Sequence, residues 1–202
     1  DSAVLEKMRA GTVHSYIYKG SKNEKFEDKS EDWGFTEPGL ANGAAYADLN
    51  NDGHLSLVVN NVNHEAGIYK NTIKANNYIT LTFTGRQDNH FGVGTKAYVF
   101  SGKQMQYEQL MLTRGFQSSV DARLHFGLGN SNKIDSILVV WPNQGYQVLK
   151  DVKGNSILNV DQNNAKGKFS YATFFPSIKP LLKDITNKMG VNWKHKEDNF
   201  VD

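Results

Sequence analysis

The sequence contains no cysteine, which excludes disulfides, thiol nucleophiles and thiolate metal sites. It has no apolar run near the ~18 residues that a membrane-spanning helix needs. The net charge is only +2 and no cluster of lysine and arginine stands out, which argues against nucleic acid as a partner. No Gly-x-Ser-x-Gly elbow and no pair of histidines at helical i, i+4 spacing occurs. These absences favour a protein that is not an enzyme.

Helical patterns are also rare, whereas turn residues are common, with 18 glycines and many asparagines. Alternation over 77–85 places Ile79, Leu81 and Phe83 on one face of a half-buried strand. We expect helices only at 3–10 and within 176–190, where Pro180 interrupts the pattern. The sequence therefore predicts a mostly β protein with little helix. The other predicted strands are 14–20 paired with 25–30, 95–100 paired with 104–112 around Gly102, 144–152 paired with 155–160, and a central strand at 133–141.

The stretch DLNNDGHLS at 48–56 alternates acidic and amide side chains and then bends at Gly53. Calcium prefers several carboxylate, amide and carbonyl oxygens, and a curled loop turns every second side chain inward. Asparagine and glycine in this order are equally typical of a plain hairpin turn. Both interpretations remain open from the spacing alone. The candidate calcium ligands are Asp48, Asn50, Asp52, the main-chain carbonyl of His54, and Ser56 through its hydroxyl or a water.

An EF-hand does not explain this loop. An EF-hand needs a bidentate glutamate at the twelfth position and flanking helices, whereas the twelfth position here is Val59 and a strand-like run follows. Ser56 stands at the ninth position, where a carboxylate would add charge. The spacing therefore predicts a weak calcium site at most.

A ten-residue pattern occurs twice, at 26–35 and at 182–191. Both copies read apolar-x-Asp-x-hydroxyl-x-x-apolar-Gly-apolar. Internal repeats indicate arrays or propellers before other folds. We expect three parts: a repeat segment at 1–75, a β-domain at 76–162, and a linker with the start of a further repeat at 163–202.

Two regions resemble known families. NGAAYADLNNDGHLSLVVNNVN at 42–63, followed by AGIYKN at 66–71, resembles the FG-GAP/VCBS repeat, whose loop has the form D-x-[DN]-x-D-G-x-x-D. Ser56 departs from that form. The pieces NNYITLTFTG, NHFGVGTKAYVF, RGFQSS, LHFGLGN, IDSILVVWPNQG and NSILNV resemble the ASPIC/UnbV domain, which accompanies such repeats in cartilage acidic proteins and bacterial surface proteins.

The resemblance implies propeller-type repeat hairpins joined to a transthyretin-like antiparallel β-sandwich, with calcium in a structural role. We expect a non-enzymatic extracellular binding or scaffold module of a larger bacterial protein that is secreted or on the cell surface. Its partner would be a protein or a glycan, as in adhesion. The chain opens at DSAVLEKM without an initiator Met or signal peptide, so we expect a native product that is longer at both ends.

The alternative function is a domain or subunit of a polysaccharide-acting enzyme. It requires acidic side chains that converge in a cleft, with Glu108, Asp121 and Asp135 as candidates. Other motifs favour structural roles. FGVGTK at 91–96 is typical of a tight turn rather than a phosphate loop, and Trp141, at the end of an apolar run, is typical of a core residue.

Overall fold

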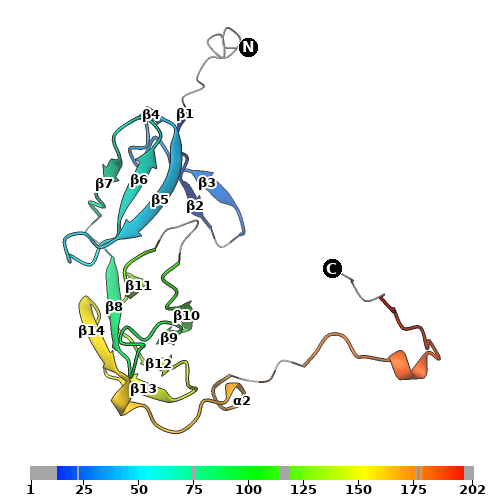
Figure 1. Ribbon diagram of the computed structural model, residues 1–202. Helices are drawn as coiled ribbons and strands as arrows, with labels where there is room; N and C mark the ends of the chain where they lie inside the picture. The colour runs from blue at the N-terminus through cyan, green and yellow to red at the C-terminus, as the bar shows by residue number, and fades with distance from the viewer. Residues whose placement is uncertain are drawn as a thin grey trace. The chain divides into compact units, whose positions relative to one another are not determined.

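The computed structural model describes residues 13–21, 23–73, 76–113, 119–175, 177 and 179–197, and most of its regular structure is β-strand (Figure 1). The prediction of a mostly β protein with little helix is confirmed. One compact unit ends at Lys168 and a second begins at Phe169. The helix predicted at 3–10 lies outside the described residues. No helix among the described residues is both long and apolar enough to cross a membrane.

Seven short strands form the N-terminal segment, which we define as residues 13–73. β1 pairs with β4, β2 pairs with β3, and β5, β6 and β7 form an antiparallel sheet in that order. The predicted hairpin at 14–30 is confirmed, because the Ser21 N–H donates to the Lys25 carbonyl at 2.9 Å. The strands are β1 (Val13–His14), β2 (Tyr18–Gly20), β3 (Phe26–Asp28), β4 (Pro38–Gly39), β5 (Ala41–Ala47), β6 (Ser56–Asn61) and β7 (Gly67–Tyr69).

The N-terminal segment has a thin core. Among its described apolar residues only Phe35 and Val59 are buried, at 6% and 4% exposure. The ring of Phe35 stacks on Tyr69 with centroids 4.3 Å apart. Since burial of apolar surface drives folding, this segment depends on a neighbour for much of its stability.

The two-sheet domain, defined as residues 77–166, holds the main core. One sheet has the order β10-β9-β12-β13 and the other the order β11-β8-β14. The hairpin around Gly102 and the central position of β12 are confirmed, since β12 pairs with both β9 and β13. The strands are β8 (Asn77–Thr84), β9 (Lys96–Ser101), β10 (Gln104–Gln109), β11 (Leu124–Gly129), β12 (Ser136–Val140), β13 (Tyr146–Lys150) and β14 (Ser156–Asp161), followed by the short 3-10 helix η1 (Gln162–Asn164).

Both sheets contribute to one apolar core. Ile79 and Leu81 of β8 face Ile137 and Val139 of β12 in a single cluster, and all four are fully buried. Trp141 is 1% exposed, so its predicted place in the core is confirmed. The tight turn predicted at 91–96 is also confirmed. Gly92 has φ +65°, and a β-carbon there would lie 2.9 Å from the Trp141 ring, so only glycine fits.

The predicted pairing of 144–152 with 155–160 is wrong. β13 and β14 lie in different sheets, and β14 pairs in parallel with β8. The turn between them redirects the chain, because Asp151 and Asn155 both have φ +57°. The side chain of Asn155 then fixes the start of β14 to β8, since its Oδ1 accepts from the Tyr78 N–H at 3.1 Å.

The apolar face of β8 is buried, as predicted, and its polar face is partly covered as well. Thr80 on that face is 2% exposed, and its Oγ1 lies 3.0 Å from Nδ1 of His125. His125 in turn stacks on Tyr78 with ring centroids 5.5 Å apart. This second layer of contacts places β8 between the core and the N-terminal segment.

The second unit contains a four-residue helix, α2 (Tyr171–Phe174), and a 3-10 turn, η2 (Thr186–Lys188). The longer helix predicted within 176–190 is absent from its described residues, since only η2 forms there. η2 belongs to the second copy of the ten-residue pattern. Asp184 Oδ1 accepts from the Thr186 N–H at 2.8 Å, as Asp28 Oδ1 accepts from the Ser30 N–H at 2.9 Å in the first copy.

Candidate calcium loop and its seat on the two-sheet domain

The loop between β5 and β6 closes on itself through its carboxylates. The two oxygens of Asp48 accept from the N–H groups of Asp52 and Gly53, at 3.1 and 2.8 Å. The amide of Asn50 donates to Asp52 Oδ2 at 2.7 Å. Three of the predicted ligands, Asp48, Asn50 and Asp52, are therefore gathered in one turn, as the alternation of the sequence predicts.

The turn keeps the Asp52 carboxylate ionised. The hydrogen bond from Asn50 is the main cause that lowers the pKa of Asp52, and the N–H and ring of His54 lower it further. A carboxylate oxygen that accepts one N–H retains a lone pair for a cation, and Asn50 retains its Oδ1. The oxygens of this turn thus fit a hard cation such as calcium chemically.

His54 and Ser56, the two remaining predicted ligands, are held by other contacts. The Nδ1 of His54 lies 3.1 Å from Asp52 Oδ1, so its ring is held inside the loop. Ser56 begins β6 opposite Ala47 and is 5% exposed, so it belongs to the sheet. Nowhere in the described residues do three or more histidine, aspartate or glutamate side chains gather in a way that could hold a metal. Amide and carbonyl oxygens would have to complete any calcium shell.

The loop presses against the two-sheet domain at Gly53. Gly53 has φ +84°, and a β-carbon there would overlap the ring of Tyr78 on β8. The same ring lies 6.2 Å from that of His54, between centroids. Glycine is therefore required twice at this position, for its backbone conformation and for the close approach.

A second contact joins the loop to the segment before β11. Arg123 donates from Nη1 to Asn51 Oδ1 at 2.7 Å and pairs through Nε with Asp121 at 2.9 Å. Asn51 has φ +55°, which asparagine tolerates better than most residues. One guanidinium thus bridges the loop to a carboxylate of the two-sheet domain.

A cavity of about 150 Å³ lies beside this contact. Its wall includes Asp48 of the loop together with Glu108, Asp121 and His125 of the two-sheet domain. Burial lowers the pKa of His125, although the negative charge of Asp48 opposes the shift. Asp135, the third candidate carboxylate, is elsewhere and accepts from the Gly102 N–H at 2.6 Å.

Local patterns in the sequence do not reveal the two residues that contact the loop from the two-sheet domain, Tyr78 and Arg123. Alternation places Tyr78 on the polar face of its strand, and nothing in that pattern indicates that the face is covered. The bend predicted at Gly53 was the one available signal of a close approach at this place.

The fold and site define a two-sheet β-domain with an oxygen-rich loop from a neighbouring sheet seated on it. Residues 85–167, most of the two-sheet domain, match the family model described as ASPIC and UnbV. The resemblance of this part of the chain to the ASPIC/UnbV domain is therefore confirmed. No curated protein matches the chain. The FG-GAP/VCBS repeat stays a prediction.

Proposed function

We propose that residues 13–168 form a calcium-stabilised, non-enzymatic binding or scaffold module of a larger extracellular surface protein. The observation that carries this proposal is the seat of the loop. The turn that gathers Asp48, Asn50 and Asp52 also contacts Tyr78 and Arg123 of the neighbouring domain. A cation bound in this turn would stiffen both the loop and the junction. In the full proposal the N-terminal segment is a propeller-type repeat and the two-sheet domain a transthyretin-like sandwich.

The composition of the loop agrees with an extracellular setting. Two carboxylates hold calcium less strongly than the three or four of high-affinity sites, and extracellular modules bind calcium with dissociation constants on the order of 10⁻⁴–10⁻³ M. Such a site fills only where calcium is abundant. A binding partner, protein or glycan, would contact the exposed loops of the module.

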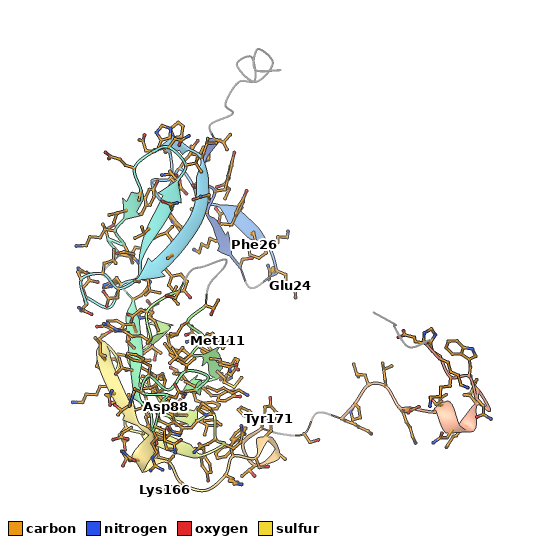
Figure 2. All side chains as sticks on the ribbon, viewed as in Figure 1. Glu24, Phe26, Asp88, Met111, Lys166 and Tyr171 are labelled. Atoms are coloured by element: carbon orange, nitrogen blue, oxygen red, sulfur yellow. The ribbon has the colours of Figure 1, made fainter. Side chains whose placement is uncertain are left out.

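Thermal unfolding with and without calcium tests this proposal. If calcium binds only the folded chain, a concentration 100 times its dissociation constant should stabilise by about 2.7 kcal/mol. Asp52→Ala should remove that gain. Asp88→Ala, which removes an exposed carboxylate of the two-sheet domain (labelled in Figure 2), should leave it unchanged. With the dissociation constants above, that concentration is about 10–100 mM, and a melting temperature unchanged there would reduce the loop to a turn.

The cavity favours a second candidate function, a domain of a polysaccharide-acting enzyme. Glu108 and Asp121 line the same wall, as paired carboxylates in glycoside hydrolysis would. The test is release of reducing ends from a panel of soluble polysaccharides. Glu108→Gln and Asp121→Asn should each abolish the activity, and Asp135→Asn, outside the cavity, should not. No release by the unaltered chain would remove this candidate.

A further inference from the structure

The seam between β13 and β14 is open on one side of the two-sheet domain. β13 is the last strand of one sheet and β14 the last strand of the other. A groove between them is lined by residues 146–149 of β13, residues 158–161 of β14 and residues 163–166 of the following turn. Leu149 and Leu158, which pack against the core, form part of its floor.

The outer edge of β13 offers backbone groups in a known direction. Alternate residues of an antiparallel strand turn their N–H and C=O to the same side. Those of Tyr146 face away from β12, because the Lys166 N–H donates to the Tyr146 carbonyl at 2.7 Å and the Tyr146 N–H donates back at 3.4 Å (Lys166 is labelled in Figure 2). Val148 and Lys150 therefore present their N–H and C=O to the same open side. Val148 is also 41% exposed.

Gln147 contributes to the seam a hydrogen-bond acceptor that lacks a donor among the described residues. Its side chain is 93% buried, since the residue is 7% exposed, and it lines the groove. Its Oε1 has no hydrogen-bond partner among the described residues. A buried acceptor without a donor is costly, so an incoming donor at this point would be favoured.

We propose that the seam binds an extended strand of a partner protein, which pairs with β13 at Val148 and Lys150. The strand would place an apolar side chain beside Leu149 and a hydroxyl or amide donor beside Gln147. Lys166 and Asp161 both line the groove, and Lys150 ends β13, so an acidic outward residue opposite Lys150 would suit the partner strand.

A second copy of β13 fits this edge less well than a short strand does. Antiparallel pairing centred on Val148 would need the outward groups of Tyr146, and Lys166 already holds these. A short strand that starts past this bridge has no such conflict. The proposal goes beyond the calcium-stabilised module and does not depend on calcium, so either one can fail alone.

The test uses the full chain, labelled with ¹⁵N, and a capped peptide with the core sequence Glu-Val-Thr-Thr. In the antiparallel register these residues lie opposite Lys150, Leu149, Val148 and Gln147 in turn. We expect the amide signals of Val148 and Lys150 to shift and their hydrogen exchange to slow. N-methylation of the peptide residue opposite Val148 removes a donor to β13 and should weaken binding about tenfold. N-methylation opposite Leu149, where the N–H faces away, should have little effect.

The contact with Gln147 has its own matched pair. Replacing the last threonine of the core peptide by valine keeps its shape and removes its hydroxyl, and should weaken binding severalfold. In Gln147→Leu, which should remain folded because it removes an unsatisfied buried acceptor, the valine peptide should bind better. Equal binding of the two N-methylated peptides would overturn the proposal. Hydrogen exchange at Val148 that slows as the protein concentration is raised, without any peptide, would also overturn it. A second copy of the chain would then occupy the seam.

Discussion

Gly53 lies against the ring of Tyr78 so closely that a β-carbon at position 53 would overlap the Cε1 and Cζ atoms of that ring. The turn that gathers the loop oxygens and the strand at the centre of the three-stranded sheet are therefore in direct contact. A substitution in the turn should therefore also affect the packing of β8, and the free energy of unfolding reports this effect.

Gly53→Ala should destabilise the chain through this contact. A non-glycine residue at φ +84° costs about 1–2 kcal/mol, and the overlap with Tyr78 should add about 1–3 kcal/mol. Gly34→Ala is a matched control, because Gly34 has φ +82° and no atom within 4 Å of its would-be β-carbon. The free energy of unfolding from urea titration measures both. Equal losses in the two variants would show that Tyr78 does not restrict the loop.

Ser56→Asp should couple stability to calcium more strongly. Ser56 is 5% exposed, and a carboxylate placed there is costly unless a cation or donors compensate it. We expect a lower melting temperature without calcium and a larger rise with calcium than in the unaltered chain. Ser56→Asn, of the same shape without the charge, is the control. A loss that is the same with and without calcium would place residue 56 outside any cation site.

Arg123→Ala and Asn51→Gly should be coupled. The hydrogen bond between them joins loop to domain at 2.7 Å, and glycine at 51 accepts the positive φ. A double-mutant cycle should give a coupling of about 1 kcal/mol, which is modest for a hydrogen bond from a charged donor because this one is exposed. If the two losses simply add, the contact contributes nothing to stability.

His125 should make stability depend on pH. Burial lowers its pKa below the ordinary 6.5, so the unfolded chain takes up a proton at higher pH than the folded chain. The neutral His125 ring contributes fully to stability above pH 6.5. This contribution is lost as the pH falls through 6.5 toward the pKa of the folded chain. His125→Asn should flatten this part of the profile in urea titrations between about pH 8 and pH 5.

Residues 76–168 should fold when expressed alone. Every residue of the buried cluster lies between Ile79 and Val160, with Ala165 packed against it. Residues 13–73 alone should not, because Phe35 and Val59 are their only buried apolar residues in the described part. Dispersed amide NMR signals from the first chain and collapsed signals from the second would match this expectation. Collapsed signals from residues 76–168 would show instead that the N-terminal segment completes the core.

Alternation in the sequence predicted β8, the turn at Gly102 predicted the β9–β10 hairpin, and a run that is apolar on both faces predicted central β12. None of these patterns revealed the neighbours of β14. NSILNV looks the same whether it pairs with the strand just before it or with β8, and two positive φ values at Asp151 and Asn155 decide between them. The helix expected within 176–190 failed because Asp184 binds the Thr186 N–H and favours a turn instead.

The candidate site was likewise predicted only in its local part. Spacing identified Asp48, Asn50 and Asp52, whose contacts lie within one turn. Tyr78 and Arg123 were missed, because the contacts that bring them to the loop span different parts of the chain, and local patterns carry no information about such pairs. Gln147 occupies an inward position on an otherwise apolar strand face, and in the sequence it is simply one polar residue among others.

The parallel pairing of β14 with β8 has a consequence for how the chain is made. Asn159 donates to Thr82, which lies 77 residues earlier. A ribosome therefore releases β8 long before the strand that completes its sheet exists, and closing so long a loop is entropically slow. Through that interval Ile79, Leu81 and Phe83 have no completed core to enter, and the nascent chain carries an apolar strand with an open edge. The nascent chain should thus be most prone to aggregation until synthesis has passed Val160.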